Sequence, residues 1–331
     1  MGRLEIIFSV TLIAVVQNSK TWVIKYFDNK GTNMKINYYN DELNDDFAED
    51  KDKIKPIKID ENYKYIHKNL LWNITAIILY RIIFSIPVYI HTKIKYKFEI
   101  VNREALKKEK KNGYFIYGNH TNEFIDPFFP TFITFPKRVY VIANADNVSI
   151  PGLKTAIRML GALPVPDNIK ASKNFFKAIK YYINKNKVIA IYPEAHVWPF
   201  YTKIRNYKSV SFKYPIELDK PVYSFTTTYQ KFENNKRKKY NTGKKDNKYD
   251  TIKTNNKNDE VIKNEIGPKE ALKRDKIKIV TYVDGPFYPD KTLNKKEAQE
   301  KLRNEVYEAM NNRSKNSNIE IIKYVKRGKN D

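Results

Sequence analysis

The sequence predicts an α/β fold with a mixed, mostly parallel sheet flanked by helices, preceded by an N-terminal membrane-associated helix. From Lys95 onward, short apolar runs typical of strands alternate with charged or amphipathic segments typical of helices, and this alternation indicates a layered α/β structure. Before it, Leu70–Ile90 is the most apolar stretch, and its 21 residues are enough for a membrane-spanning helix.

Length and composition limit the possible classes of protein. The 331 residues allow one domain of ordinary to large size with appendages. Because there are no cysteines, structural disulfides and cysteine-ligated zinc are excluded. The formal net charge of +25, from 62 Lys and Arg against 37 Asp and Glu, favours anionic partners: a membrane surface, nucleic acid, or phosphorylated and CoA-like substrates.

Residues 1–62 are expected to form an N-terminal extension and linker. The run Ile6–Val16 has the length of a signal-peptide core, but it lacks a small-residue cleavage site and is too short to span a bilayer, so its role stays open. Residues 28–62 are polar and charged without periodicity, which is typical of a loop.

Residues 63–94 are expected to be a membrane-associated helical segment. In its apolar part, Leu70–Ile90, the central Arg81 costs about 2.5–3.5 kcal/mol on an insertion scale, while twelve Leu, Ile, Val and Phe residues return about 0.3–0.6 kcal/mol each. Both flanks are basic, so the charge asymmetry that orients a spanning helix is missing. An in-plane or re-entrant helix fits better than a simple crossing, and a buried core helix is the soluble alternative.

Residues 95–312 are expected to form the catalytic domain, followed by a basic tail at 313–331. The expected strands are Lys97–Val101, Tyr114–Tyr117, Val139–Ala143, Val188–Tyr192, Val222–Tyr229 and Lys276–Asp284, and the expected helices are Glu104–Lys110, Leu153–Met159, Ile169–Asn184 and Thr292–Met310. A basic low-complexity insertion at 231–272 would be a long disordered loop between two pairing strands, because residues 231–263 hold eleven Lys and Arg against five Asp and Glu. It is either a solvated tether or a contact with anionic lipid.

The chemistry concentrates where the strand Tyr114–Tyr117 ends. Gly118 permits a sharp turn, and His120 and Asp126 follow it. A histidine can act as a general base when a carboxylate fixes its tautomer and stabilises its charged form. No Ser or Cys nucleophile is evident beside the pair, so the base would activate a hydroxyl of the substrate. The alternative is that both residues are structural: His120 would form a hydrogen bond at the end of the strand, and Asp126 would cap the chain before Pro127.

These residues resemble a known family. Asn119-His120-x5-Asp126-Pro127 is similar to the first motif of the glycerolipid acyltransferases, the 1-acylglycerol-3-phosphate acyltransferases, most of which have four residues between His and Asp; five are found in a divergent branch. Tyr192-Pro193-Glu194 resembles the start of the family's Phe-Pro-Glu-Gly-Thr-Arg, but Ala195-His196-Val197 replaces Gly-Thr-Arg.

Two further blocks extend the resemblance over about residues 60–230. Leu160–Asp167 is similar to the family's intervening motif, without the arginine that normally follows its aspartate. Lys220–Phe225 is similar to the last motif, a proline-led strand lining the acceptor cleft. The order and spacing of four blocks are more specific than any one block.

The resemblance implies transfer of a fatty acyl group from acyl-CoA or acyl-carrier protein to the free hydroxyl of a lysophospholipid, above all 1-acyl-sn-glycerol-3-phosphate, giving phosphatidic acid. His120 would be the base and Asp126 its support, with no cofactor and no metal. Asn119 and Glu194 would bind substrate. Because the usual arginine is missing, Arg205, together with Lys170 or Lys208, is expected to bind the acceptor phosphate. The expected location is the cytoplasmic face of an anionic membrane.

Other functions remain open at this point. An acyltransferase with a different acceptor shares the same motifs. A non-catalytic basic protein that binds membranes or nucleic acid would explain the charge, although no nucleic-acid-binding motif is recognisable and no specific nucleic acid is expected as a partner. A metal hydrolase using His120, Asp126, Glu194 and His196 lacks the His-Glu-x-x-His spacing.

Overall fold

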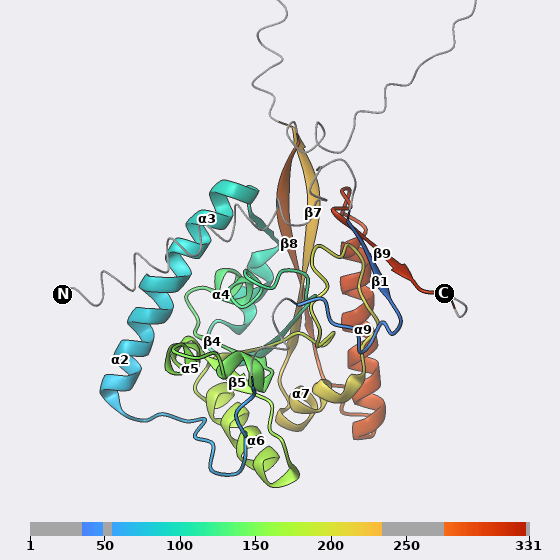
Figure 1. The fold of residues 1–331 in the computed structure, drawn as a ribbon. Coiled ribbons are helices and arrows are strands. Elements are labelled where there is room, and N and C mark those ends of the chain that lie inside the picture. The colour runs from blue at the N-terminus through green and yellow to red at the C-terminus, as the bar shows by residue number, and fades with distance from the viewer. Residues whose placement is uncertain (1–34, 49–54, 234–274, 329–331) are drawn as a thin grey trace, which may run out of the picture.

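The fold is an α/β layer structure, as the sequence predicts. The computed structural model describes residues 35–48, 55–233 and 275–328. The described residues form a seven-stranded sheet in the order β2-β8-β7-β3-β6-β4-β5 (Figure 1). The strands are β2 (Glu99–Val101), β3 (Tyr114–Gly118), β4 (Val139–Ala143), β5 (Ala162–Pro164), β6 (Val188–Ile191), β7 (Val222–Glu233) and β8 (Asp275–Phe287). Only the β7–β8 pair is antiparallel among these described strands, so the sheet is mixed and mostly parallel.

Helices cover both faces of this sheet (Figure 1). They are α4 (Phe129–Thr134), α5 (Lys154–Leu160), α6 (Ile169–Asn184), α7 (Lys213–Leu218) and α9 (Lys295–Ser314), with the short 3-10 turn η3 (Arg103–Glu109). Every residue of β3 is buried, and successive side chains point to opposite faces. Tyr114 and Ile116 pack into the core under α4, while Phe115 and Tyr117 pack into the core under α6 and α9. The strand that precedes His120 therefore lies between the two cores and contributes side chains to each.

Helix α6 shows how the sequence produces one of these layers. Asn168 caps its first turn by accepting a hydrogen bond from the Ala171 amide at 2.8 Å. Phe175 and Ile179, four positions apart, lie on the face that meets the sheet and are buried. The observed bounds are those predicted from the sequence.

The apolar segment forms one continuous helical rod of 27 residues, from Leu70 to Tyr96. It consists of α2 (Leu70–Ile78), the π-helical segment η2 (Leu79–Ser85) and α3 (Ile86–Tyr96). Its π-helical turns end just before Pro87, which has no amide hydrogen to give to the preceding turn. By length and composition this helix could cross a membrane, and it is the one such helix in the described part of the chain.

The helix has an inner and an outer face. Its inner face packs on the domain through Tyr80, Ile83 and Val88, and the Tyr80 hydroxyl lies 2.6 Å from Thr131 Oγ1. Its outer face exposes large apolar side chains along its whole length: Leu70, Leu71, Ile74, Ile77, Ile78, Ile82, Ile86, Tyr89, Ile90 and Ile94. Arg81 turns inward, where its guanidinium donates to the carbonyl of Lys137 at 3.0 Å. The helix therefore packs on the domain through one face and exposes a continuous apolar surface on the other.

The structure corrects the expectation that residues 28–62 form a loop, and it adds a strand within the basic tail at 313–331. β1 (Lys35–Tyr39) and β9 (Ile322–Lys326) form a two-stranded parallel sheet. The sequence could not reveal this pairing because each strand has only five residues and its partner lies near the other end of the chain. The run Ile6–Val16 and residues 234–274 lie outside the described residues, so the expectations about them are not addressed.

The two strands predicted to pair across the insertion do so. β7 and β8 are antiparallel neighbours, and their outermost residue pair is Glu233 with Asp275. The strands extend farther than predicted, so that β7 includes the first three residues of the segment assigned to the insertion.

Candidate active site

β3 delivers His120 to the carboxyl edge of the sheet. The last residue of β3, Gly118, must be glycine because a Cβ there would lie 2.0 Å from the Phe225 ring on β7. Two residues later, His120 Nδ1 lies 2.7 Å from Asp126 Oδ2. The His120 side chain is 19% exposed while that of Asp126 is fully buried, so the pair has one solvent-facing and one protected partner.

The surroundings of Asp126 hold its carboxylate in place. Asp126 Oδ2 also accepts a hydrogen bond from the Asn122 amide at 2.8 Å, which ties the carboxylate to the turn between the two residues. Burial raises the pKa of the Asp126 carboxyl, although the hydrogen bond from His120 and the backbone amides act to lower it. The charged form is thus stabilised locally by His120 and by the turn.

Tyr192, at the end of β6, supports both members of the pair. Its ring stacks on the His120 imidazole with 4.6 Å between centroids and 26° between planes. Its hydroxyl donates to the backbone carbonyl of Asp126. Burial, with the nearby Asp126 charge, raises the pKa of the Tyr192 hydroxyl well above its ordinary value, so it stays protonated and a donor. The imidazole orientation is therefore fixed by a carboxylate at one edge and an aromatic ring on one face.

This arrangement can act as a general base. With Nδ1 engaged by the carboxylate, Nε2 is the nitrogen that can take a proton from an incoming hydroxyl, and the carboxylate stabilises the imidazolium that results.

The comparisons with known proteins bear on this geometry. The sequence model of the Acyltransferase family matches residues 97–227, which include β3, the His120 pair and β6. Over these residues, which make up less than half of the chain, the sequence is similar to the Acyltransferase family. A solved structure that it resembles is the 1-acyl-sn-glycerophosphate (LPA) acyltransferase PlsC from Thermotoga maritima, at 14% sequence identity and a TM-score of 0.40, covering 67% of this chain and 74% of that one. The search of curated proteins gave no match.

Glu194 connects the segment that follows β6 to the segment that holds His120. Its carboxylate accepts hydrogen bonds from the His120 amide and from the Arg205 amide, each at 2.9 Å. Ala195, where the family motif has glycine, takes φ +62°, the left-handed region that glycine adopts most readily. The segment that follows pairs with the His120 loop, since the Trp198 amide donates to the His120 carbonyl at 3.1 Å. The backbone of the base is therefore held by the second motif.

Arg205 lies behind Glu194 rather than in an open cleft. Its side chain is fully buried; Nη2 lies 3.4 Å from Glu194 Oε2 and donates to the His196 carbonyl, and the guanidinium stacks 4.9 Å from the Trp198 ring. The expectation that Arg205 binds the acceptor phosphate is thus opposed by its burial. Glu194 is only 3% exposed, and both of its carboxylate oxygens accept hydrogen bonds from backbone amides. Its burial therefore also argues against direct binding of the acceptor headgroup by Glu194.

Asn119 also has a different place from the one expected. Its side-chain amide donates to the Thr227 carbonyl at 3.0 Å and accepts from the Thr227 amide at 2.8 Å. Both polar atoms are therefore engaged by the β7 backbone, and the residue is buried. Asn119 locks the turn before His120 to the neighbouring strand, and its role in binding substrate stays a prediction.

Lys170 and Lys208 are exposed, as a phosphate ligand must be before substrate arrives. Lys170 lies in the first turn of α6, at the same carboxyl edge of the sheet as His120, and Lys208 precedes the 3-10 turn Ser209–Phe212. Among the described residues, no hydrogen bond or ion pair joins either lysine to the His120 motif. Their role as phosphate ligands stays a prediction.

The structure contains a second histidine–carboxylate pair that was not predicted from the sequence. His196 Nδ1 lies 2.7 Å from Asp46 Oδ2, and both side chains are partly exposed. His196 was visible in the second motif, but its partner comes from a segment read as linker. Within the described residues, no three His, Asp or Glu side chains gather as metal ligands.

Proposed function

We propose that this acyltransferase transfers a fatty acyl group from a CoA or acyl-carrier-protein thioester to the free hydroxyl of a lysophospholipid, with 1-acyl-sn-glycerol-3-phosphate as the preferred acceptor. The observation that carries the proposal is the 2.7 Å contact between His120 Nδ1 and buried Asp126, in a domain whose family transfers acyl groups. No cysteine exists in the chain to form a thioester intermediate.

In the proposed reaction His120 Nε2 takes the proton of the acceptor hydroxyl as its oxygen attacks the thioester carbonyl. Asp126 stabilises the imidazolium in that step. When the tetrahedral intermediate collapses, the carbon–sulfur bond breaks, and the imidazolium gives its proton to the departing thiolate. Such a base contributes about 10²–10⁴-fold, and positioning of the two substrates supplies a further part of the rate.

Two features support a lipid acceptor. The outer face of the Leu70–Tyr96 helix presents an apolar surface suited to lying in the plane of a membrane, where both acceptor and product reside. The net charge of +25 favours the anionic cytoplasmic leaflet. The cation that meets the acceptor phosphate is proposed to be Lys170 or Lys208, since Arg205 is engaged behind Glu194.

The experiment is a product analysis. Purified protein is incubated with acyl-CoA, or with acyl-carrier protein, and a panel of lyso-acceptors, and the lipid products are read by mass spectrometry. We expect phosphatidic acid from 1-acyl-sn-glycerol-3-phosphate, and loss of all acyl transfer in His120→Ala with an unchanged melting temperature. A His120→Ala variant that keeps more than about a tenth of wild-type turnover contradicts the base mechanism.

The acceptor phosphate is tested separately. Lys170→Gln or Lys208→Gln should raise the KM for lysophosphatidate by about tenfold, the effect of one lost charge-assisted hydrogen bond, with little change in kcat. If neither KM changes, the acceptor phosphate is held elsewhere or the acceptor carries none.

A further inference from the structure

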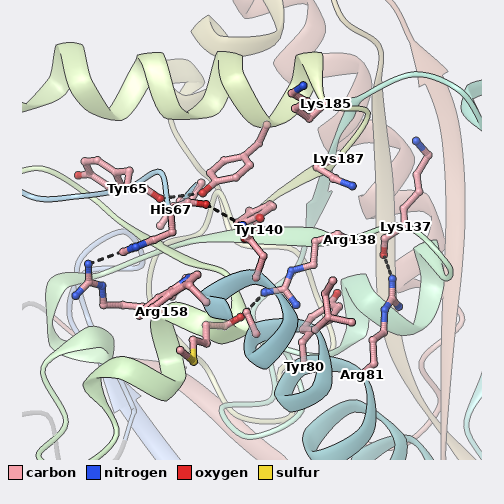
Figure 2. Close-up of a pocket in the computed structure, with 18 of the residues that line it drawn as sticks. Tyr65, His67, Tyr80, Arg81, Lys137, Arg138, Tyr140, Arg158, Lys185 and Lys187 are labelled. Carbon is pink, nitrogen blue, oxygen red and sulfur yellow. Dashed lines mark hydrogen bonds between the residues drawn. The ribbon is translucent and has the colours of Figure 1, made fainter. Parts of the chain in front are cut away.

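A second candidate site lies at the opposite edge of the sheet from His120. A cavity of about 660 Å³ opens between the α2–η2 helix, the loops that enter β4 and β6, and the end of α6 (Figure 2). Arg138 and Lys187 immediately precede β4 and β6, so they mark the amino edge, while His120 follows β3 at the carboxyl edge. A strand of five residues separates the two edges by on the order of 15 Å. The cavity is therefore distinct from the proposed reaction centre.

The lining of this cavity is strongly cationic. The basic residues that line it are Lys64, Arg81, Lys110, Lys137, Arg138, Arg158, Lys185 and Lys187, and no Asp or Glu is among the described lining residues. Figure 2 shows Arg81, Lys137, Arg138 and Lys187 gathered toward one end of it. They come from three separate segments of the chain, so the fold, rather than a local run of basic residues, brings them together.

The two arginines are held in place but their charge is not neutralised. Each uses Nη2 on backbone carbonyls: Arg81 on Pro136 and Lys137, and Arg138 on Met159. Both guanidinium groups lie over the Tyr80 ring, at 5.0 and 3.7 Å from its centroid. In each, Nη1 is buried without a hydrogen-bond partner among the described residues. Fixed, desolvated guanidinium groups are pre-organised for an oxyanion.

Lys187 interacts electrostatically with both Arg138 and Arg81. It is partly buried, and no described residue forms a hydrogen bond or ion pair with its ammonium. Burial lowers its pKa, and the charges of Arg138 and Arg81 lower it further. Lys137 shows a similar effect, since its pKa is lowered by burial and by Lys187, with Glu109 opposing. The positive charges in this cluster therefore repel one another, and a bound anion would reduce that repulsion.

We propose that this cavity binds a phosphate-bearing anion, with Lys187, Arg138 and Arg81 as its ligands, at a site separate from acyl transfer. The same chemistry is offered by two sources: the headgroup of an anionic phospholipid or a soluble phosphate. The lipid source is favoured by position, because α2 and η2 line the cavity with one face and expose Leu71, Ile74 and Ile78 on the other.

Lys187→Gln is the test variant, because it removes one cation and no hydrogen bond to a described residue. Lys180→Gln on the exposed face of α6 is the matched control with the same change in charge. In the first arm, the melting temperature is followed while inorganic phosphate replaces chloride at constant ionic strength. In the second arm, co-sedimentation is measured with vesicles of phosphatidylcholine alone and with added phosphatidylglycerol. Arg81→Gln repeats both arms with a second ligand.

The expected result is a loss confined to the cavity variants. In the chloride buffer without phosphate, Lys187→Gln should not lower the melting temperature, because it relieves repulsion between the cations. With phosphate or anionic vesicles its Kd should rise about tenfold, the effect of one lost charge-assisted contact, while Lys180→Gln matches the wild type. A loss in the vesicle arm alone identifies a lipid headgroup, and a loss with free phosphate alone identifies a soluble ligand. If Lys187→Gln and Arg81→Gln both behave as Lys180→Gln in both arms, the proposal is overturned.

Discussion

Replacing Asp126 by asparagine separates the charge of the pair from its geometry. Asp126 Oδ2 accepts from His120 Nδ1 at 2.7 Å and from the Asn122 amide at 2.8 Å, whereas Oδ1 is buried and has no partner among the described residues. The asparagine oxygen should therefore take the place of Oδ2, because the amide nitrogen there would face the Asn122 donor. The variant keeps the hydrogen bond and the His120 tautomer but loses the negative charge.

The size of the effect follows from that distance. For unit charges 2.7 Å apart, Coulomb's law with an effective dielectric constant of about 20–40 gives about 3–6 kcal/mol of support for the imidazolium. This corresponds to a fall in kcat of about 10²–10⁴-fold. The KM for both substrates should change little, because Asp126 is buried and reaches neither of them.

The effect on stability should be small and should depend on pH. The asparagine Nδ2 would be a buried donor without a partner, at a cost of about 1–3 kcal/mol, while the cost of burying a charge disappears. Because burial raises the pKa of Asp126 in the folded state, the folded protein binds this proton more readily than the unfolded chain. The stability that Asp126 contributes is therefore greatest in acid and is lost as pH rises from about 4 through the folded pKa; Asp126→Asn removes this dependence.

The assay follows the release of CoA with a thiol reagent, which reads CoA alone because the protein has no cysteine. Asp219→Asn is the matched control: Asp219 is exposed, its ion pair with Lys291 lies on the surface, and asparagine tolerates its left-handed backbone. Turnover of Asp126→Asn within about fivefold of wild type, in a folded preparation, would refute the reasoning, because imidazolium support would then come from elsewhere.

Two further predictions concern the scaffold. Arg205→Gln leaves the buried Glu194 carboxylate without its cation, so it should lower the free energy of unfolding by about 3–5 kcal/mol. Urea denaturation measures this change, with Lys203→Gln at an exposed position as the control. A raised acceptor KM at unchanged stability would instead show that Arg205 contacts substrate. Excision of residues 234–274, with Asn-Gly inserted to join Glu233 to Asp275, should leave the melting temperature and acyl transfer unchanged, because these two residues are already paired across β7 and β8. Additional deletion of Gln230 shifts the register by one residue and should destabilise the protein strongly, and equal stability of the two deletions would contradict the observed pairing.

The local sequence determined the layered fold and the reactive pair. Periodicity over short stretches located α6 and the buried strands, because a residue's face in a helix or strand depends only on its spacing from its neighbours. His120 and Asp126 could be paired from sequence since one turn, tied by the Asn122 amide, brings them together. The long apolar helix was equally visible in composition, but its inward-facing Arg81 was not.

The tertiary structure decided what each polar residue does. Asn119 is engaged by Thr227, 108 positions away, and His196 by Asp46, 150 positions away, so neither role could be read locally. Arg205 was expected to meet a phosphate, yet the fold buries it on Glu194. Lys187 is one of 62 Lys and Arg residues in the sequence, and only the approach of Arg81 and Arg138 makes it part of a cationic cavity. The sequence specifies which residues are charged. How deeply each charge is buried and which groups it contacts depend on distant segments that only the folded chain brings together.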